Sequence, residues 1–328
     1  MKTESMAARM ADRRKESALW SVCRLGGPRD ARAGTRRRGP VIGIRTYIIA
    51  ACLVAAAFLC GAVPSRAAEP VPLPAYLSDR GDSIPTSLFG TYIREKEFLF
   101  YPFYEYTRTP KFEYEPNELG FTGDGEYVGK LVEHEALVFF AYAINDSLAI
   151  ELESAVYSSI HFTKASNDNT NVPSDIRESG LGDTEINIRW RYKKETVTRP
   201  EVTFFFKTVF PFQKNKKLIG TQNWEFAPGI VLTKGYPFGT LALRLSLEYE
   251  TGENKVKFDE WAIDYVKRLT PLWSVVLSLE GAEADEVSII GEVQYTLSKN
   301  AVLKINSGFG LVEKAPDFAP EIGVLFRF

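Results

Sequence analysis

The last eight residues of the chain alternate in character, and this constrains the fold more than any other feature. Apolar residues occupy one set of alternate positions: Ile322, Val324, Phe326 and Phe328. The other set is mostly polar or small: Glu321, Gly323, Leu325 and Arg327. Because successive side chains of a β-strand point to opposite faces, this period of two predicts a strand with one apolar face.

The same ending resembles the C-terminal assembly signal of Gram-negative outer-membrane β-barrels. That pattern specifies a polar residue, a glycine and two aromatic residues, and this chain places Glu321, Gly323, Phe326 and Phe328 at those positions. The resemblance implies that the barrel-assembly machinery and periplasmic chaperones are partners of the chain. The alternative is an ordinary edge strand that ends the chain.

Residues 1–67 are predicted to be a secretory signal peptide with an over-long N-terminal extension. The apolar run 47–63 follows several arginines, and Ser65 and Ala67 stand at the two positions that signal peptidase reads, so we expect cleavage after Ala67. A transmembrane helix is the alternative, but it prefers about 20 apolar residues. The forty residues before the run are too long for an ordinary leader and point to a mis-assigned start codon.

Removing the leader leaves an acidic chain without cysteine. Residues 1–67 hold 13 of the 40 basic and 4 of the 42 acidic residues, so 27 basic and 38 acidic residues remain, a net charge of −11. An acidic surface argues against nucleic acid as a partner. All three cysteines (Cys23, Cys52 and Cys60) lie in the leader, which excludes disulfides and thiolate chemistry in the mature chain.

The rest of the chain is predicted to be all-β. Residues 68–94 form a periplasmic lead-in or partial plug, with a short strand at 87–93 as the alternative, and residues 95–328 form the barrel. Twelve strand-like runs can be counted, and ten or fourteen strands are the alternatives. The runs are 97–108, 130–144, 147–162, 183–194, 201–211, 222–234, 239–250, 256–268, 271–281, 286–298, 301–312 and 319–328.

These runs predict a single closed antiparallel transmembrane β-barrel. Their length suits the about 9–11 residues of a tilted membrane-spanning strand, and long connections alternate with short ones, as in outer-membrane proteins. Since lipid cannot satisfy an open sheet edge, the sheet must close. The eighth run changes phase between Phe258 and Trp261, which predicts a β-bulge at Asp259–Glu260.

Aromatic residues gather at both ends of the apolar face, as in the girdles that meet the two lipid interfaces. One group lies toward the extracellular side: Trp224, Tyr249 and Trp261. The other lies toward the periplasm: Trp190, Tyr192, Tyr265, Trp273, Tyr295 and Phe328. We therefore expect outer-membrane lipid and lipopolysaccharide around the barrel.

A narrower resemblance covers about the last half of the chain. The sequence Gly180-Leu181-Gly182-Asp183, the stretch 209–250 and the ending 310–328 resemble outer-membrane proteins assigned to transport in the meta-pathway of phenol degradation. Phe212-Gln213 replace the Thr-Gly of that family. The resemblance implies an outer-membrane location and a phenol-like cargo.

Strand alternation assigns sixteen charged residues to the lumen. They are Glu151, Glu153, Glu185, Arg189, Arg191, Lys207, Glu225, Arg244, Glu248, Glu260, Asp264, Glu280, Glu292, Lys304, Glu321 and Arg327. Pairing across the turns sets Glu151 and Glu153 beside Arg189 and Arg191. Two interpretations stay open: a salt-bridged core that seals the barrel, and a narrow aqueous channel in which the acidic excess favours cations.

The sequence predicts a narrow channel or transporter for a small solute that it does not specify. The alternative is a plugged structural or surface-interaction barrel, and the remote alternative is a lipid-modifying enzyme. Catalysis is not expected, because Ser158, Ser159 and His161 lie on a strand in a spacing that makes no dyad. No metal or cofactor motif is present; the acidic loop 168–175 is a weak candidate for Ca²⁺, because Asn and Ser dominate it.

Overall fold

The computed structural model describes residues 73–328 apart from 118, 214, 253, 283–285 and 313–314. The predicted leader, with Ser65 and Ala67, lies outside the described residues. One short 3-10 helix, η2 (Ala75–Leu77), precedes fifteen strands in the described part of the chain. No helix within these residues is long and apolar enough to cross a membrane.

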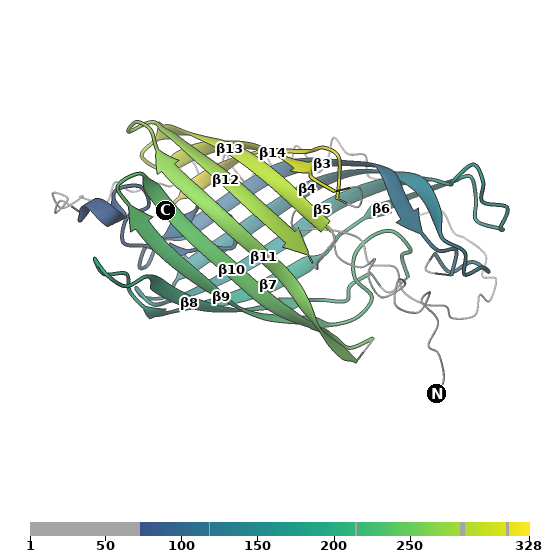
Figure 1. Cartoon of the computed structure of the whole chain (residues 1–328), viewed down its shortest axis with the longest axis horizontal. Coiled ribbons are helices and arrows are strands. Elements are labelled where there is room, and N and C mark those ends of the chain that lie inside the picture. Colours follow the sequence, from purple (N-terminus) through teal and green to yellow (C-terminus); the bar gives the residue numbers. More distant parts are fainter. Residues whose placement is uncertain (1–72, 118, 214, 253, 283–285, 313–314) are drawn as a thin grey trace. The chain divides into compact units, whose positions relative to one another are not determined.

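Twelve of the strands close into an antiparallel barrel (Figure 1). They are β3 (Phe98–Tyr114), β4 (Tyr127–Ala143), β5 (Leu148–Thr163), β7 (Thr184–Lys193), β8 (Glu201–Val209), β9 (Glu225–Tyr236), β10 (Gly239–Glu250), β11 (Lys255–Arg268), β12 (Trp273–Ala282), β13 (Glu286–Ser298), β14 (Ala301–Gly310) and β15 (Ala319–Arg327). Each pairs with its neighbours in the chain, and β15 pairs with β3 to close the ring. The predicted all-β fold of twelve strands is confirmed.

The strand that follows β5 is broken by the glycine motif. One half of β5 pairs with β6 (Asp175–Gly180) and the other half with β7. At the break, Gly182 donates to the Ala155 carbonyl at 2.8 Å, and a Cβ on Gly182 would lie only 2.6 Å from that of Ala155. Residues 180–183 therefore form a close bend in the barrel wall, and the bend requires a residue without a side chain.

The first two barrel strands are longer than the sequence predicted. β3 and β4 each span 17 residues, against the expected 97–108 and 130–144. The excess residues extend past the other strands into a cap at one end of the barrel. The cap, residues 112–117, 119–127, 160–176 and 216–219, encloses an apolar cluster that includes Tyr114, Phe162 and Leu218.

The predicted bulge in the eighth run is present in β11. The register jumps so that Asp259 and Glu260 together face Ser246 of β10. The Ser246 hydroxyl donates to Asp259 Oδ2 at 2.8 Å and accepts the Glu260 backbone N–H at 3.3 Å. The hydroxyl thus satisfies the backbone group that the bulge removes from the ladder.

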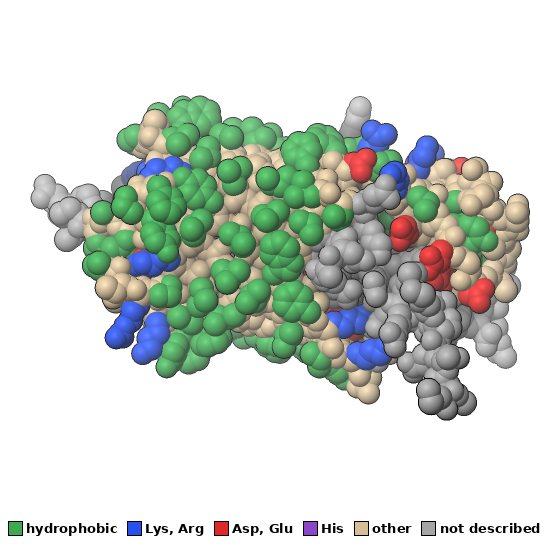
Figure 2. Space-filling view, in the orientation of Figure 1, with side chains coloured by type: hydrophobic (Ala, Val, Ile, Leu, Met, Phe, Trp, Pro, Cys, Tyr) green, Lys and Arg blue, Asp and Glu red, His purple; other side chains and the backbone are tan. Residues whose placement is uncertain are grey.

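The connections at the two ends of the barrel differ in length. We call the end with short turns, such as 237–238 and 299–300, the turn end, and the opposite end, with connections such as 115–126 and 164–174, the loop end. Hydrophobic side chains spread over the outward face between the two ends (Figure 2). Aromatic pairs such as Trp273–Tyr295, with ring centroids 4.5 Å apart, lie at the turn end.

The segment before β3 lies inside the barrel. We call residues 75–93 the plug: it comprises η2 and a hairpin of β1 (Ile84–Pro85) and β2 (Tyr92–Ile93). Most residues from Leu77 to Ile93 are buried. The hairpin strands pair with each other and join no barrel strand in the described ladders, so side chains and loop backbone hold the plug to the wall.

Candidate functional site in the barrel lumen

One side of the plug packs against an apolar part of the wall. Ile84, Leu88 and Ile93 of the plug join one buried cluster with inward residues of β3, β4, β5 and β15. The wall residues of this cluster are Leu99, Tyr101, Phe103, Leu137, Phe139, Ala141, Ala143, Ala149, Ala155 and Leu325. This cluster explains why parts of β3 and β4 carry apolar residues on their inward face, where they meet the plug.

Other parts of the plug meet charged residues of the wall. Lys304 of β14 donates to the Phe89 carbonyl at 3.3 Å and to Thr91 Oγ1 at 3.0 Å. Arg244 of β10 donates to the Ser87 carbonyl at 3.4 Å, and the Ser87 N–H donates to Glu151 at 3.1 Å. The barrel wall thus supplies the hydrogen-bond partners that the plug backbone lacks inside its own hairpin.

The tip of the plug hairpin fits closely against β12 and β13. Gly90 has φ +66°, and a Cβ there would lie 2.4 Å from Val276 Cγ2 and 2.9 Å from Gln294 Nε2. Phe89 beside it packs with Val276 and Ile290. Only glycine combines this backbone conformation with this approach.

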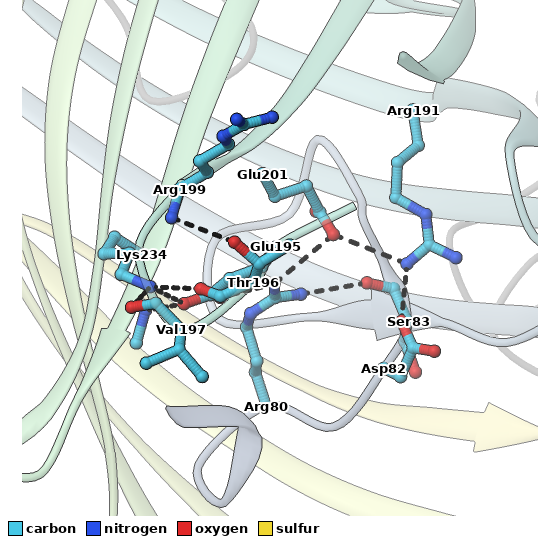
Figure 3. A network of polar contacts seen from close by, with 11 residues as sticks. Arg80, Asp82, Ser83, Arg191, Glu195, Thr196, Val197, Arg199, Glu201 and Lys234 are labelled. Atoms are coloured by element: carbon cyan, nitrogen blue, oxygen red, sulfur yellow. Dashed lines mark hydrogen bonds and ion pairs between the residues drawn. The ribbon is translucent and has the colours of Figure 1, made fainter. Parts of the chain in front are cut away.

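A buried ionic network holds the plug at the turn end (Figure 3). Arg80 contacts Glu195 Oε2 at 2.8 Å and Glu201 Oε2 at 3.3 Å. Arg191 contacts the same Glu201 at 3.4 Å and Asp82 of the plug at 3.1 Å. Two plug residues and two wall strands therefore share these charges, which are almost fully desolvated at Arg80, Glu195 and Glu201.

The structure buries twelve of the sixteen predicted lumen residues: Glu151, Glu153, Glu185, Arg189, Arg191, Glu225, Arg244, Glu248, Asp264, Glu292, Lys304 and Glu321. The other four are half-buried: Lys207, Glu260, Glu280 and Arg327. In a closed barrel whose outward face is exposed, burial on alternate positions places these side chains on the inward face.

Several of these residues form ion pairs across the wall. Arg189 Nε lies 3.0 Å from Glu151, Arg244 Nε lies 2.7 Å from Glu260, and Lys304 Nζ lies 3.4 Å from Glu292. Glu280 also approaches Arg244, at 3.6 Å. Asp264 accepts the Ser278 hydroxyl at 2.5 Å, and Arg327 contacts Glu97 at 3.3 Å.

The expected contact of Arg191 with Glu151 and Glu153 is wrong. The β5–β7 ladder ends at Leu148 opposite Trp190, so Arg191 lies beyond it and binds Glu201 and Asp82 instead. Glu153 pairs directly with Glu185, and Glu151 with Asn187. Turn geometry, which alternation alone does not give, decides this register.

Sequence reasoning missed two groups of lumen residues. Glu105, Glu133 and Glu135 are buried on β3 and β4, and Glu105 lies directly opposite both Glu135 and Glu321. Their spacing of two was visible but stood among apolar residues on both faces. The plug residues Arg80 and Asp82 carried no periodic pattern that could have revealed them.

Three residues of the proposed assembly signal, Glu321, Gly323 and Phe326, lie along the seam where β15 meets β3. Glu321 accepts the Tyr101 hydroxyl at 2.5 Å, and the rings of Phe326 and Phe100 stack with centroids 6.2 Å apart. A Cβ on Gly323 would lie 2.5 Å from Phe103 Cβ. Phe328 is 39% exposed.

The acidic loop 168–175, a Ca²⁺ candidate in the sequence, binds the side chain of a lysine. Lys164 Nζ donates to the Thr170 and Val172 carbonyls at 2.8 and 2.9 Å and lies 3.7 Å from Asp168. Its ammonium takes the position that a cation would need. Burial opposes ionisation of Asp168, but hydrogen bonds from Thr170 and the Tyr114 hydroxyl outweigh it and lower the pKa of that carboxyl.

Ser158 and His161, the candidates for a catalytic pair, contact different partners. Ser158 faces the lumen and donates to Glu133 at 3.3 Å, whereas His161 contacts Asp175 at 2.8 Å. Among the described residues, no group of three or more His, Cys, Asp or Glu side chains is arranged to hold a metal ion.

A closed twelve-stranded barrel with an apolar outward face and a charged lumen has the fold of an outer-membrane β-barrel. The chain belongs to the family described as Putative MetA-pathway of phenol degradation, whose sequence model matches residues 136–328. No curated protein matches its sequence closely enough to count as a relative.

Three solved structures are similar to this chain at low sequence identity. An outer membrane channel from Pseudomonas putida F1 is 12% identical, with a TM-score of 0.53 over 75% of this chain and 100% of that one. The KdgM porin, in complex with disordered oligogalacturonate, is 10% identical, with a TM-score of 0.42 over 70% and 99%. The translocator domain of the autotransporter NalP from Neisseria meningitidis is 9% identical, with a TM-score of 0.44 over 71% and 88%.

Proposed function

We propose that this protein is a narrow outer-membrane channel for a small solute, with the turn end in the periplasm. The observation that carries the proposal is the way the plug is held. Every barrel strand is paired on both sides, whereas the plug hairpin is joined to the wall only by side-chain and loop contacts. The plug can therefore shift without breaking backbone hydrogen bonds between barrel strands. A barrel with a purely structural core has no need of a plug that can move.

The cargo class we propose is small and aromatic, of the phenol type. The family description supports this choice, and the fold likeness to the Pseudomonas putida channel supports passage through the barrel rather than catalysis. A phenol carries one hydroxyl and an apolar ring, and the lumen offers both polar side chains and the apolar wall of β3–β5.

Single-channel recording in planar lipid bilayers tests this function. The wild-type protein should conduct in small steps, and Arg80→Met should enlarge them, because the plug loses its contacts with Glu195 and Glu201. Arg199→Met is the matched control. Arg199 is exposed in the same turn as Glu195, and its hydrogen bond is made by its backbone N–H rather than by its side chain. If neither the wild type nor Arg80→Met conducts, the result would instead support a plugged structural barrel.

The charge of the lumen should set its ion selectivity. Arg244 is buried and is paired with Glu260 and Glu280, so Arg244→Glu adds negative charge to an acidic wall and should raise cation selectivity. The reversal potential in a salt gradient measures this. An unchanged reversal potential in a folded, conducting variant would mean that ions do not pass beside Arg244.

We also propose that the leader is removed after Ala67 and that the C-terminal residues direct assembly. N-terminal sequencing of membrane-extracted protein should begin at or next to Ala68, and peptides spanning 62–72 in the mature pool would refute cleavage. Deleting Phe328 should lower outer-membrane levels and increase periplasmic degradation. Normal accumulation of the truncated chain as a heat-modifiable band would refute the assembly role.

A further inference from the structure

Buried polar atoms without a partner are concentrated on one side of the lumen. Seven of them lie on β7 to β10, each without a hydrogen-bond partner among the residues the structure describes. They are Asn187 Oδ1, Arg189 Nη1 and Arg191 Nε on β7, Glu201 Oε1 and Thr203 Oγ1 on β8, Thr233 Oγ1 on β9 and Thr240 Oγ1 on β10. Their residues are all at most 3% exposed. Burying a polar group without a hydrogen bond costs about 1–3 kcal/mol, so seven such atoms in one region need an explanation.

These residues form an unbroken line along the inner wall. Asn187, Arg189 and Arg191 follow one another at every second position of β7. Arg191 lies directly opposite Thr203, which shares its face of β8 with Glu201. The line continues from Glu201 to Thr233 opposite it.

The line ends at the turn end of the barrel. Thr233 lies opposite Ala242, and Thr240 is two positions from Ala242 on the same face of β10. Direct and diagonal cross-strand neighbours are about 5–8 Å apart, a spacing that one small molecule with two hydrogen-bonding ends can bridge. A cavity beside this line is bordered by plug residues 85–92 together with Arg189 and Arg244.

The apolar side of the lumen contrasts with this line. There the plug residues Ile84, Leu88 and Ile93 pack directly on β3–β5. Hydrophobic contact without polar groups leaves no favourable place for a polar molecule. The apolar patch under the plug therefore offers a polar solute less than the line from Asn187 to Thr240 does.

We infer that small hydroxylated molecules and water pass the plug along the line from Asn187 to Thr240, with the plug still in place. The inference rests on the proposed channel function and names the path within it. The line presents donors at the two arginines, acceptors at Asn187 and Glu201, and threonine hydroxyls that do both. A molecule that both donates and accepts matches every position, whereas an ion of one sign would meet opposing groups along the way.

Cysteine labelling in intact proteoliposomes tests the path. Thr203→Cys and Thr233→Cys are compared with Ala141→Cys, a control that is equally buried on the apolar side. All three are made in a chain whose Cys23, Cys52 and Cys60 are replaced by serine. The probe is 2-hydroxyethyl methanethiosulfonate, which is small, neutral and hydroxylated.

We expect the two threonine positions to react about tenfold faster than Ala141→Cys, because a sealed apolar contact exposes its groups only when it opens. Equal rates, or a faster reaction at Ala141→Cys, would overturn the path. Osmotic swelling of wild-type proteoliposomes in glycerol separates this failure from that of the channel. If the proteoliposomes swell but the labelling rates are equal, the path is rejected and the channel function stands. If the wild type admits no solute, both the path and the channel function are rejected.

A second variant tests the hydroxyls themselves. Thr203→Val/Thr233→Val keeps the side-chain shape and removes two hydrogen-bonding groups, so glycerol entry should slow about fivefold. Thr109→Val, at a buried inward position of β3, should leave the rate unchanged. An equal rate in the double variant would show that the hydroxyls do not contribute to passage.

Discussion

Two kinds of interaction hold the plug in the lumen: hydrophobic contact in one region, and ion pairs and hydrogen bonds in another. On the β3–β5 side, Ile84, Leu88 and Ile93 contact an apolar wall, and the contact is non-directional. Around the rest of the plug, Arg80, Arg191, Arg244 and Lys304 bind carboxylates and backbone carbonyls at defined distances. The difference teaches that the apolar contacts supply adhesion, while the directional polar contacts determine where the plug sits.

The largest effect is expected on the apolar side. Phe139 is fully buried against the plug cluster, so Phe139→Ala should lower the free energy of unfolding by about 4 kcal/mol. Urea unfolding in lipid vesicles measures this loss. Val231→Ala, on the polar side with Phe205 and Ala242, should cost clearly less. Equal costs would mean that the two sides do not differ as described.

The polar side should show the cost of an unpaired buried charge. Arg189 is 1% exposed and is paired with Glu151, so Arg189→Met should cost about 3 kcal/mol by leaving that carboxylate without its guanidinium. The same unfolding measurement applies. The double variant Arg189→Met/Glu151→Gln removes the charge as well and should recover most of the loss. A double variant no more stable than the single one would contradict this reading.

The plug tip should depend on a single glycine. At Gly90, Ala would meet both a positive φ and the Val276 side chain, so Gly90→Ala should cost about 2 kcal/mol. Faster proteolysis of the plug in detergent-solubilised protein would report its release. Gly291→Ala is the control, since its Cβ would meet only Leu277, at 3.9 Å. Equal protease resistance in the two variants would argue against a close fit at the tip.

The smallest effect concerns the cap and depends on pH. The pKa of Asp168 is lowered in the folded protein, so its stabilising contribution is present above the unfolded pKa of about 3.9 and is lost as pH falls through the folded value. Asp168→Asn should lower the stability of the cap at neutral pH by about 1 kcal/mol. It should also reduce the further loss of cap stability that occurs in the wild type as the pH falls. Hydrogen exchange of residues 164–174 measures this, with exposed Asp317→Asn as the control. Identical pH profiles would exclude the role.

The path and the fold respond to different changes. Polar variants such as Thr203→Val should alter passage with little loss of stability, whereas apolar variants such as Phe139→Ala should do the reverse. A barrel in which both classes of variant changed both quantities would have one coupled lumen rather than two sides.

Local alternation was enough to predict the wall of this protein. A strand has a side-chain period of two, so runs such as 239–250 and 319–328 identify both their extent and their inward residues, and lipid requires the sheet to close. The bulge at Asp259–Glu260 was equally visible, because it breaks that period. The closed barrel of twelve strands therefore followed from the chain alone.

Only the tertiary structure decided what fills the barrel. The plug has no periodic pattern, and its position depends on contacts between distant residues such as Arg80 and Glu201. The partner of Arg191 changed because the ladder ends before it reaches that residue, and the buried carboxylates of β3 and β4 became apparent only once their strands were paired. Alternation reports which face a side chain occupies, whereas its partner across the lumen depends on closure and register, and neither property is local.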